Sequence, residues 1–233
     1  MVLAIITARA NSKGLPGKNM IEIGQKPLIE YSFEIASRTS SFDKIVLSTD
    51  IDDAILLAKE KFSAIDIPFK RPDFLCGDKV SQQEVVNHVL NYYEQNNISF
   101  SHFILLQPTS LFRKIIEMEK GVELLKNGCS SVIGVSHILH HPADYLYKDN
   151  EGKIKFVMPE FAGRPRQEFP TIFFNNGAFY GCSVEFFKTE GVFYNEESTL
   201  LEMSDHSVVD IDTKFDLDIA RGVLFQNNNI WKY

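Results

Sequence analysis

The sequence predicts an α/β fold, in which a mostly parallel, twisted sheet carries helices on both faces. Apolar runs of strand-forming residues alternate with amphipathic segments along the chain. The runs are apolar throughout rather than at every second residue, which is typical of parallel strands buried on both faces. With 233 residues, 44% of them hydrophobic, the chain can bury one substantial core. We therefore expect a single domain, 1–233, with a small insertion.

The first half of the chain contains regular strand and helix pairs. Apolar runs predict strands at 2–8, 44–50, 101–107 and 130–136. Helical spacing predicts helices at 27–39, 52–61, 81–96 and 114–128. Ser81 and Glu84 have the spacing of a capping box at the start of the third helix, and Gly128 closes the fourth.

The alternation breaks between about 137 and 172. Residues 145–158 predict a hairpin that turns at 150–152, and a loop rich in Pro and Arg follows. We interpret this segment as an inserted lobe, after which 173–181 return to the sheet. The last unit is expected to be a strand at 207–212 followed by a helix that Thr213 opens, with Asp216 three residues on.

Charge and cysteine content limit the classes of function. The chain has 24 basic and 31 acidic residues, a net charge of −7, which argues against nucleic-acid binding. Three widely spaced cysteines without a C-x-x-C pair favour a reducing compartment over a disulfide scaffold. The start of the chain has no basic segment before its apolar run, and no run approaches membrane-spanning length. We expect a cytoplasmic protein that binds neither nucleic acid nor membranes.

The most informative stretch is ITARANSKGLPGKN, residues 6–19, directly behind the first expected strand. Its glycines and proline permit tight turns, so that backbone N–H groups can converge on an anion. Arg9, Lys13 and Lys18 add positive charge, which can reverse the sign of a pocket locally. A phosphate loop of the P-loop type needs glycine at Ser12 and Ser or Thr at Asn19, and a dinucleotide fingerprint also needs glycine at Ser12. The alternative is a surface turn with solvated lysines.

A second stretch is DIDT, which places Asp210 and Asp212 two residues apart. In a strand both carboxylates point to one face, and they would suit Mg²⁺ bound together with substrate phosphates. The alternative is a solvent-facing strand end that caps the next helix. That explains Thr213 but not two acidic residues around Ile211.

Further polar stretches follow other strands, and on its own each is at least as compatible with an ordinary loop as with a binding site. Gln107 and Arg113 come after the third strand, and Asn175 and Asn176 lie in an Asn-Asn-Gly segment. Other donors are Arg71, Ser81, Arg164, Arg166 and Gln167. His137, His140 and His141 have no matching Cys or Glu spacing, so we expect a structural or surface role for them. Ser183 lacks the G-x-S-x-G pattern, so nothing supports hydrolase chemistry.

Taken in order, these stretches resemble the acylneuraminate cytidylyltransferases, or CMP-sialic acid synthetases. The resemblance runs from Ile5 to about Arg221. It rests on ARANSKGLPGKN, GQKPLIEYS, FDKIVLSTD, RPDFLCGD, LQPTSLFR, RPRQEFP, NGAFY and DIDT. The related enzymes for the eight-carbon sugar Kdo have a first loop that ends in G-K-P, where this chain has G-K-N.

The resemblance implies a nucleotide-diphospho-sugar transferase fold, which is Rossmann-like, with the lobe at 137–172 serving for homodimerisation. It implies that CTP and a nine-carbon 2-keto sugar acid give the CMP-sugar and pyrophosphate with Mg²⁺, for a cell-surface glycan such as capsule or lipopolysaccharide. Nucleotide binding would fall to Arg9, Ser12, Lys13, Lys18, Asn19, Arg71 and Ser81. Sugar binding would fall to Gln107, Arg166 and Asn176, with Phe193 and Tyr194 at positions that reach a partner's site. Asp210 and Asp212 would hold the metal, and the catalytic set would be Lys18, Asp212 and Arg9.

One position departs from the family pattern. Some sialic acid enzymes have a basic residue where this chain has Phe174, two positions before Asn176. We keep N-acetylneuraminic acid as the leading expectation for the acceptor, with deoxy or N-acylated relatives such as legionaminic or pseudaminic acid as alternatives. A non-catalytic nucleotide-sugar-binding protein is the remaining alternative, although the presence of both Asp210 and Asp212 argues against it. The glycine pattern disfavours an NAD-dependent oxidoreductase.

Overall fold

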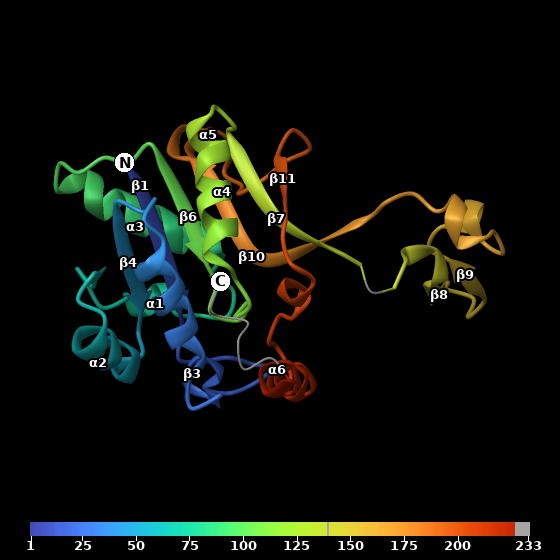
Figure 1. The fold of residues 1–233 in the computed structure, drawn as a ribbon, viewed down its shortest axis with the longest axis horizontal. Coiled ribbons are helices and arrows are strands. Elements are labelled where there is room, and N and C mark those ends of the chain that lie inside the picture. Colours follow the sequence, from blue (N-terminus) through green and yellow to red (C-terminus); the bar gives the residue numbers. More distant parts are fainter. Residues whose placement is uncertain (139, 227–233) are drawn as a thin grey trace.

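A computed structural model of the protein describes residues 1–138 and 140–226. A seven-stranded sheet forms its centre (Figure 1). From one edge to the other it contains β11 (Thr199–Glu202), β7 (Ser131–His137), β10 (Phe173–Ser183), β6 (His102–Leu106), β1 (Val2–Ala8), β4 (Lys44–Thr49) and β5 (Ile65–Asp66).

Parallel pairing dominates this sheet. β6, β1, β4 and β5 are mutually parallel, as are β11 and β7, while β10 runs antiparallel to both of its neighbours. The prediction of a mostly parallel sheet is confirmed. Since β1, β4 and β6 point the same way, the segments that follow them meet at one edge of the sheet.

Helices cover both faces, as expected. α1 (Leu28–Arg38), α2 (Asp52–Lys61) and α4 (Ile115–Lys126) pack through one apolar cluster on the first face. α3 (Gln82–Gln95) and α5 (Val184–Glu190) pack through a second cluster on the other face. The capping box that the sequence predicts at Ser81 is present, since its hydroxyl accepts from Glu84 N and the Glu84 carboxylate accepts from Ser81 N.

The last unit differs from the prediction. α6 (Lys214–Gln226) is present and is opened by reciprocal bonds between Thr213 and Asp216. The predicted strand at 207–212 is wrong: a 3₁₀ turn, Asp205–Val208, leads into an irregular segment. The place beside β7 is taken by β11, and Ile211 is buried in a third apolar cluster under α6 instead. The apolar character of this segment reflects that burial.

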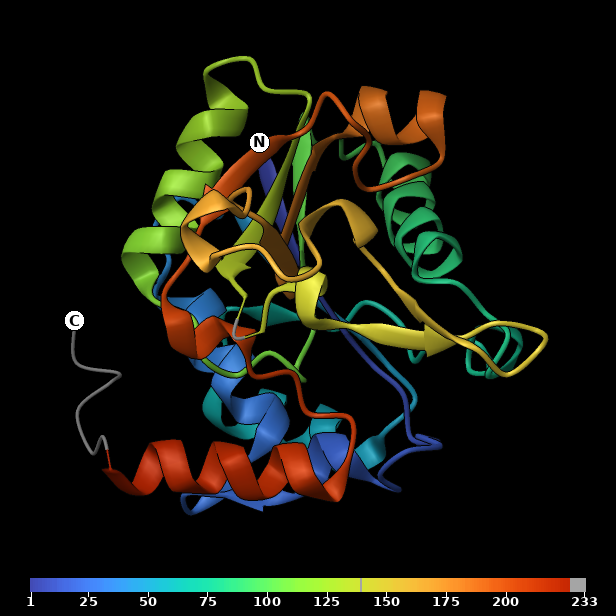
Figure 2. The same ribbon diagram turned by 90° about the vertical axis from the view of Figure 1, so that its right-hand side faces the viewer.

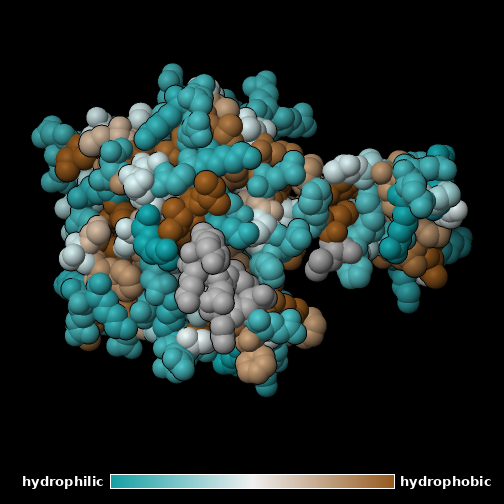
Figure 3. Space-filling model, viewed as in Figure 1, coloured by the Kyte–Doolittle hydropathy of each residue, from teal (hydrophilic) through white to brown (hydrophobic). Residues whose placement is uncertain are grey.

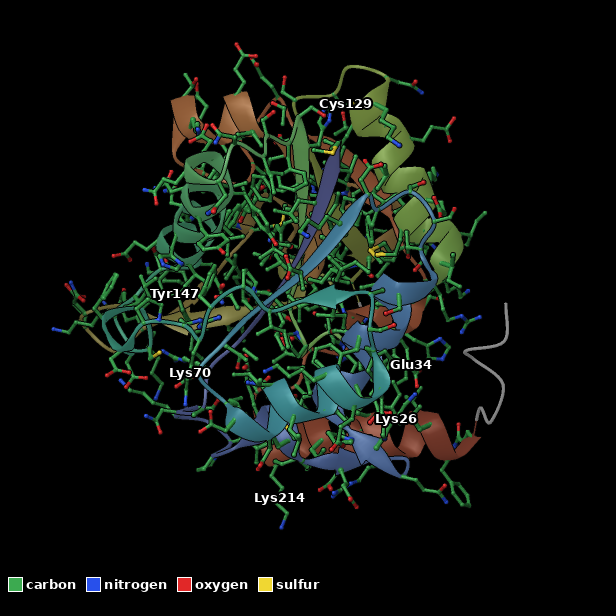
Figure 4. The ribbon with its side chains drawn as sticks, turned by 90° about the vertical axis from the view of Figure 1, so that its left-hand side faces the viewer. Lys26, Glu34, Lys70, Cys129, Tyr147 and Lys214 are labelled. Atoms are coloured by element: carbon green, nitrogen blue, oxygen red, sulfur yellow. The ribbon has the colours of Figure 1, made fainter. Side chains whose placement is uncertain are left out.

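Residues 140–172 form a lobe that projects from the sheet beyond β7 and β10 (Figure 1), and Figure 2 looks onto this lobe. It holds the expected hairpin, β8 (Leu146–Lys148) and β9 (Ile154–Phe156), whose turn contains Gly152 at φ +79°. The space-filling view in Figure 3 shows the lobe standing clear of the main body. Tyr147, labelled in Figure 4, belongs to this hairpin and is 54% exposed.

A short hairpin, β2 (Glu22–Ile23) and β3 (Lys26–Pro27), follows the basic loop and was not expected from the sequence. Lys26 forms an ion pair with Glu34 of α1, at the side of the molecule labelled in Figure 4. This contact attaches the hairpin to α1. Within the described residues, no helix combines the length and the apolar character needed to cross a membrane.

Candidate functional site

A cavity of about 290 Å³ lies at the edge of the sheet where β1 and β6 end. Thr7 and Ala8 line it from the end of β1, and Pro108 and Thr109 line it from the loop after β6. Eight of the residues predicted from the sequence also line it: Arg9, Ser12, Lys18, Asn19, Arg71, Gln107, Asp210 and Asp212. The structure thus brings together the basic loop and the acidic pair.

The basic loop has a defined shape. Gly17 adopts the left-handed conformation at φ +65°, and a single 3₁₀ turn, Lys18–Met20, follows it. Asn19 is buried, and its Nδ2 donates to the carbonyl oxygen of Arg9 at 3.0 Å, which closes the loop at its base. The loop therefore holds its cations at fixed places around the cavity.

The loop lies directly against the acidic segment. A Cβ atom at Gly14 would stand 2.5 Å from the carbonyl oxygen of Asp212, so only glycine permits this approach. Lys18 Nζ donates to Asp212 Oδ1 at 2.6 Å and to the carbonyl oxygen of Ile211 at 3.3 Å. A lysine of the loop and a carboxylate from the last unit are therefore in direct contact at the cavity.

Asp210 and Asp212 have different surroundings. Asp212 is exposed, whereas Asp210 is partly buried, and burial raises the pKa of its carboxyl although Thr109 donates a hydrogen bond that opposes the rise. Among the described residues, Oδ1 of Asp210 is buried without a hydrogen-bond partner. The sequence argument placed both carboxylates on one side because they would lie on a strand. That premise is wrong, yet both side chains do line the cavity while Ile211 between them is buried in the core.

The acidic pair fits a magnesium ion held jointly with a substrate. The residues that the structure describes contain no group of three or more His, Cys, Asp or Glu side chains that would hold a metal unaided. Mg²⁺ commonly binds through one or two carboxylates and completes its shell with phosphate oxygens and water. The unpartnered oxygen of Asp210 and the exposed carboxylate of Asp212 supply that donor set.

Arg71 enters the cavity from the segment after β5. Its guanidinium is buried, donating from Nη2 to the carbonyl oxygen of Ser48 at 2.5 Å and from Nε to Ser48 Oγ at 3.2 Å. Burial lowers the pKa of Arg71. The end of β4 therefore fixes a cation in the wall of the cavity.

Sequence reasoning gave no role to Asp78, which also lines the cavity. Its carboxylate forms ion pairs with Arg9 Nη2 at 3.3 Å and with Lys13 Nζ at 3.1 Å. Lys13 is paired with Asp78 and is not itself among the residues that line the cavity. The RPDFLCGD stretch contained Asp78, but no local pattern linked it to Lys13 and Arg9, which are 65 and 69 positions earlier in the chain.

Behind Gln107, a buried arginine joins the end of β6 to the middle of β10. Arg113 donates from Nη2 to the carbonyl oxygen of Gln107 and from Nε to that of Ala178, both at 2.6 Å, and from Nη1 to Ser32 Oγ at 3.3 Å. The pairing of β10 with β7 is irregular between Asn175 and Tyr180, which leaves the Ala178 carbonyl to Arg113. Burial lowers the pKa of Arg113 to about 9, so it is a cation at neutral pH.

Five other residues predicted for the site lie outside the cavity lining. Ser81 caps α3, and Arg166 lies in the lobe, where it pairs with Asp144 at 3.3 Å. Asn176 is buried, donating to Ser136 Oγ and accepting from Ala178 N, so its amide is used inside the fold. Phe193 is buried in the second apolar cluster.

Tyr194, the fifth of them, is 45% exposed and stacks on Tyr180 at 6.1 Å between ring centroids. The amide of Asn175 donates to the Tyr194 hydroxyl at 3.4 Å. Asn175, rather than Asn176, therefore presents the more accessible amide of the Asn-Asn-Gly segment.

The three histidines lie at the base of the lobe, beside a second cavity. Nδ1 of His141 accepts from Ala143 N and so caps a 3₁₀ turn, which agrees with the structural role expected for it. His137 lies 3.8 Å from Glu202. Cys76, Cys129 and Cys182 are free thiols.

Comparison with known proteins adds evidence of kinship. Residues 3–157 match the model of a family described as Cytidylyltransferase. An N-acylneuraminate cytidylyltransferase of Streptococcus agalactiae is 28% identical over 96% of this chain, which spans only 53% of that relative's length. A CMP-N,N'-diacetyllegionaminic acid synthase of Legionella pneumophila is 33% identical over 97% of both chains. A pseudaminic acid cytidylyltransferase of Campylobacter jejuni is 29% identical over 97% of both chains.

Solved structures show the same fold at low sequence identity. The structure of a CMP:2-keto-3-deoxy-manno-octonic acid synthetase complexed with CTP superposes with a TM-score of 0.68 at 14% identity, covering 97% of this chain and 99% of that one. A 4-diphosphocytidyl-2C-methyl-D-erythritol synthase from Anaerococcus prevotii has a TM-score of 0.66, also at 14% identity, covering 96% of each chain.

Proposed function

The chain belongs to the cytidylyltransferase family, and from this premise we propose that it transfers the CMP group of CTP to a nine-carbon 2-keto sugar acid of the sialic acid type. Pyrophosphate is the second product. The chain spans about half the length of the streptococcal relatives, so the proposal concerns the reaction of this chain alone. The relatives that it spans almost completely are named for legionaminic and pseudaminic acids, which are alternatives to N-acetylneuraminic acid as the acceptor.

The observation that carries the proposal is the contact between Lys18 and Asp212 at 2.6 Å, in a cavity that also contains Arg9 and Arg71. The cations suit a triphosphate, and the carboxylates suit the metal ion that accompanies it. A surface turn with solvated lysines does not account for a lysine that is 17% exposed and bonded across the cavity. Nor does simple capping account for the unpartnered oxygen of Asp210.

In the proposed reaction, the anomeric hydroxyl of the acid attacks the α-phosphorus of CTP and pyrophosphate departs in line. Negative charge grows on the leaving oxygens, where fixed cations stabilise the transition state most strongly. Lys18 and Arg9 are placed for this task because both belong to the loop that the triphosphate would occupy. Asp210 or Asp212 would take the hydroxyl proton if it acts as the base instead of as a metal ligand.

Asp210 and Asp212 would hold Mg²⁺ together with the phosphates of CTP. When bound, the ion would neutralise phosphate charge and polarise the phosphoryl group. Lys18 is bonded to Asp212 and so orients that carboxylate.

The sugar would lie on the side of the cavity formed by Gln107. Phe174 lies outside the cavity lining but is 46% exposed at the start of β10, where it would offer the sugar an apolar surface in place of the basic residue of some sialic acid enzymes. An acceptor with deoxy or N-acyl groups suits such a surface.

We also propose that the protein is a homodimer joined by the lobe at 137–172. The hairpin of the lobe exposes Tyr145, Leu146, Tyr147, Ile154, Phe156 and Val157, an apolar set of the kind that protein interfaces bury. A dimer would explain why Arg166 and Tyr194 lie outside the cavity of their own protomer: they would serve the partner's. Light scattering of the intact chain tests the dimer, and a monomer at micromolar concentration would contradict it.

A pyrophosphate-release assay tests the function. Purified protein is given CTP, Mg²⁺ and, in turn, N-acetylneuraminic, legionaminic and pseudaminic acids, with ATP, GTP and UTP as controls. We expect release that requires CTP and one of the acids. No release from any combination, with CTP binding retained in calorimetry, would instead support a non-catalytic nucleotide-sugar-binding protein. The proposed setting is the cytoplasm, in the synthesis of a cell-surface glycan.

A further inference from the structure

Asp78 makes contact with two cations of the basic loop at once. One carboxylate oxygen, Oδ1, lies 3.3 Å from Arg9 Nη2, and the other, Oδ2, lies 3.1 Å from Lys13 Nζ. Arg9 Nη1 also donates to the carbonyl oxygen of Gly77 at 2.9 Å. The segment 77–78 therefore occupies donors of the loop that faces the cavity.

The arrangement resembles the way in which an anionic ligand would be held. Two oxygens of one anionic group each form an ion pair with a different cation, as two oxygens of a phosphate would. Asp78 itself lines the cavity, so its charge lies where the charge of a bound polyphosphate would also lie. A ligand that binds Arg9 and Lys13 must displace the Asp78 carboxylate from these two cations. The negative charge of the ligand then stays close to that of Asp78.

The contacts are of a kind that a ligand can displace. The side chains of Asp78, Arg9 and Lys13 are 37%, 32% and 78% exposed, so water screens both pairs. Asp78 differs in this respect from Asp212, whose partner Lys18 is only 17% exposed. Within the described part of the chain, Asp78 forms ion pairs with Arg9 and Lys13 alone.

We propose that Asp78 is an internal competitor for the phosphate-binding cations, which lowers the affinity of the site for polyphosphate. The application of this proposal to CTP and pyrophosphate rests on the proposed function. In that reaction a weaker hold on pyrophosphate favours release of the product. Two exposed ion pairs, each corresponding to about a 1.4- to 5-fold change in an equilibrium constant, predict a combined effect of about 2- to 25-fold.

The test measures binding of inorganic tripolyphosphate to the intact chain by calorimetry, with EDTA present to remove metal ions. Asp78→Asn removes the charge and keeps the shape, and it is expected to bind tripolyphosphate about 2- to 25-fold more tightly than the wild type. Asp73→Asn is the matched control, because Asp73 is an exposed carboxylate of the same segment that forms no recorded ion pair with Arg9 or Lys13. It should change the affinity less than 2-fold. Asp78→Glu keeps the charge and should stay close to the wild type.

Weaker binding in Asp78→Asn would overturn the proposal, because Asp78 would then position Arg9 and Lys13 for the ligand. Unchanged binding would overturn it too, and so would an equal gain in Asp73→Asn, which would indicate a long-range charge effect. A melting temperature within about 2 °C of the wild type ensures that folding does not enter the comparison. The assay uses neither CTP nor an acceptor. A failed turnover assay with the expected shift in tripolyphosphate affinity therefore rejects the proposed function alone, and the reverse pattern rejects Asp78 alone.

Discussion

Lys18 Nζ lies 2.6 Å from Oδ1 of Asp212, although the two residues are 194 positions apart in the chain. This contact joins the loop after the first strand to the segment before the last helix. It places a cation and a carboxylate side by side in the lining of one cavity, at the edge of the sheet where parallel strands end.

Lys18→Ala tests the catalytic part of this contact. We expect the turnover number for pyrophosphate release to fall about 100-fold or more, because a fixed cation at the leaving oxygens is lost. The free energy of unfolding should change by less than about 1 kcal/mol, because the partner Asp212 is 67% exposed and stays solvated. Lys59→Ala, on the exposed side of α2, is the control and should leave both quantities unchanged. A stable Lys18→Ala protein with a near-normal rate would remove Lys18 from the catalytic set.

Gly14→Ala tests the close approach of the loop to Asp212. The added Cβ would meet the carbonyl oxygen of Asp212 at 2.5 Å, so one of the two backbone segments must move. A displacement of this size should lower kcat/KM by about 10- to 100-fold. Gly222→Ala in α6 has open space around its Cβ and should be neutral or slightly stabilising. Equal kcat/KM in the Gly14 variant and the wild type would show that the loop adjusts without cost to the site.

Arg113→Met tests the buried link between β6 and β10. The substitution leaves the carbonyl oxygens of Gln107 and Ala178 without their donor, which should cost about 2–4 kcal/mol in the free energy of unfolding. Ser32→Ala removes only the 3.3 Å bond on the side of α1 and should cost less than about 1 kcal/mol. Urea unfolding of the three proteins measures both values. Similar stability of Arg113→Met and Ser32→Ala would contradict the assignment.

Asp66→Asn tests a contribution of β5 to stability that depends on pH. Burial opposes ionisation of Asp66, but hydrogen bonds from Lys44 and Tyr93 prevail and lower the pKa of its carboxyl. A lowered pKa in the folded state stabilises the protein above the unfolded-state pKa, and this stabilisation is lost as the pH falls through the folded-state pKa. Since both partners of the ion pair are 34% exposed, the variant should lose about 1 kcal/mol or less at pH 7.

Unfolding of the Asp66→Asn variant and the wild type is compared from pH 7 downwards. The difference in free energy between them should shrink as the pH falls below the unfolded-state value of about 3.9. A difference that stays constant over this range would show that packing, rather than charge, sets the contribution of Asp66.

Much of the fold follows from the sequence because its signals are local. The apolar runs at β1, β4, β6 and β7 predicted buried parallel strands, and the reciprocal caps at Ser81 and Thr213 were readable from residues three positions apart. The same holds for the glycine-rich basic loop, whose composition indicated an anion site before any partner for Lys18 was known. The strand predicted at 207–212 failed because burial of Ile211 under α6 produces the same apolar pattern as burial in a sheet.

Only the tertiary structure decided which segments far apart in the chain come into contact. The sequence by itself determined the class of fold, the cationic loop and the acidic pair, each of which depends on neighbouring residues and on strand or helix periodicity. The folded chain decided that Lys18 contacts Asp212 and that Asp78 pairs with Arg9 and Lys13. It also decided that the amide of Asn176 forms its hydrogen bonds inside the fold. Such pairings depend on the order of the strands in the sheet, because this order decides which loops, and therefore which side chains, come into contact. No local preference of the chain encodes that order, because it is set by the burial of all the apolar faces together.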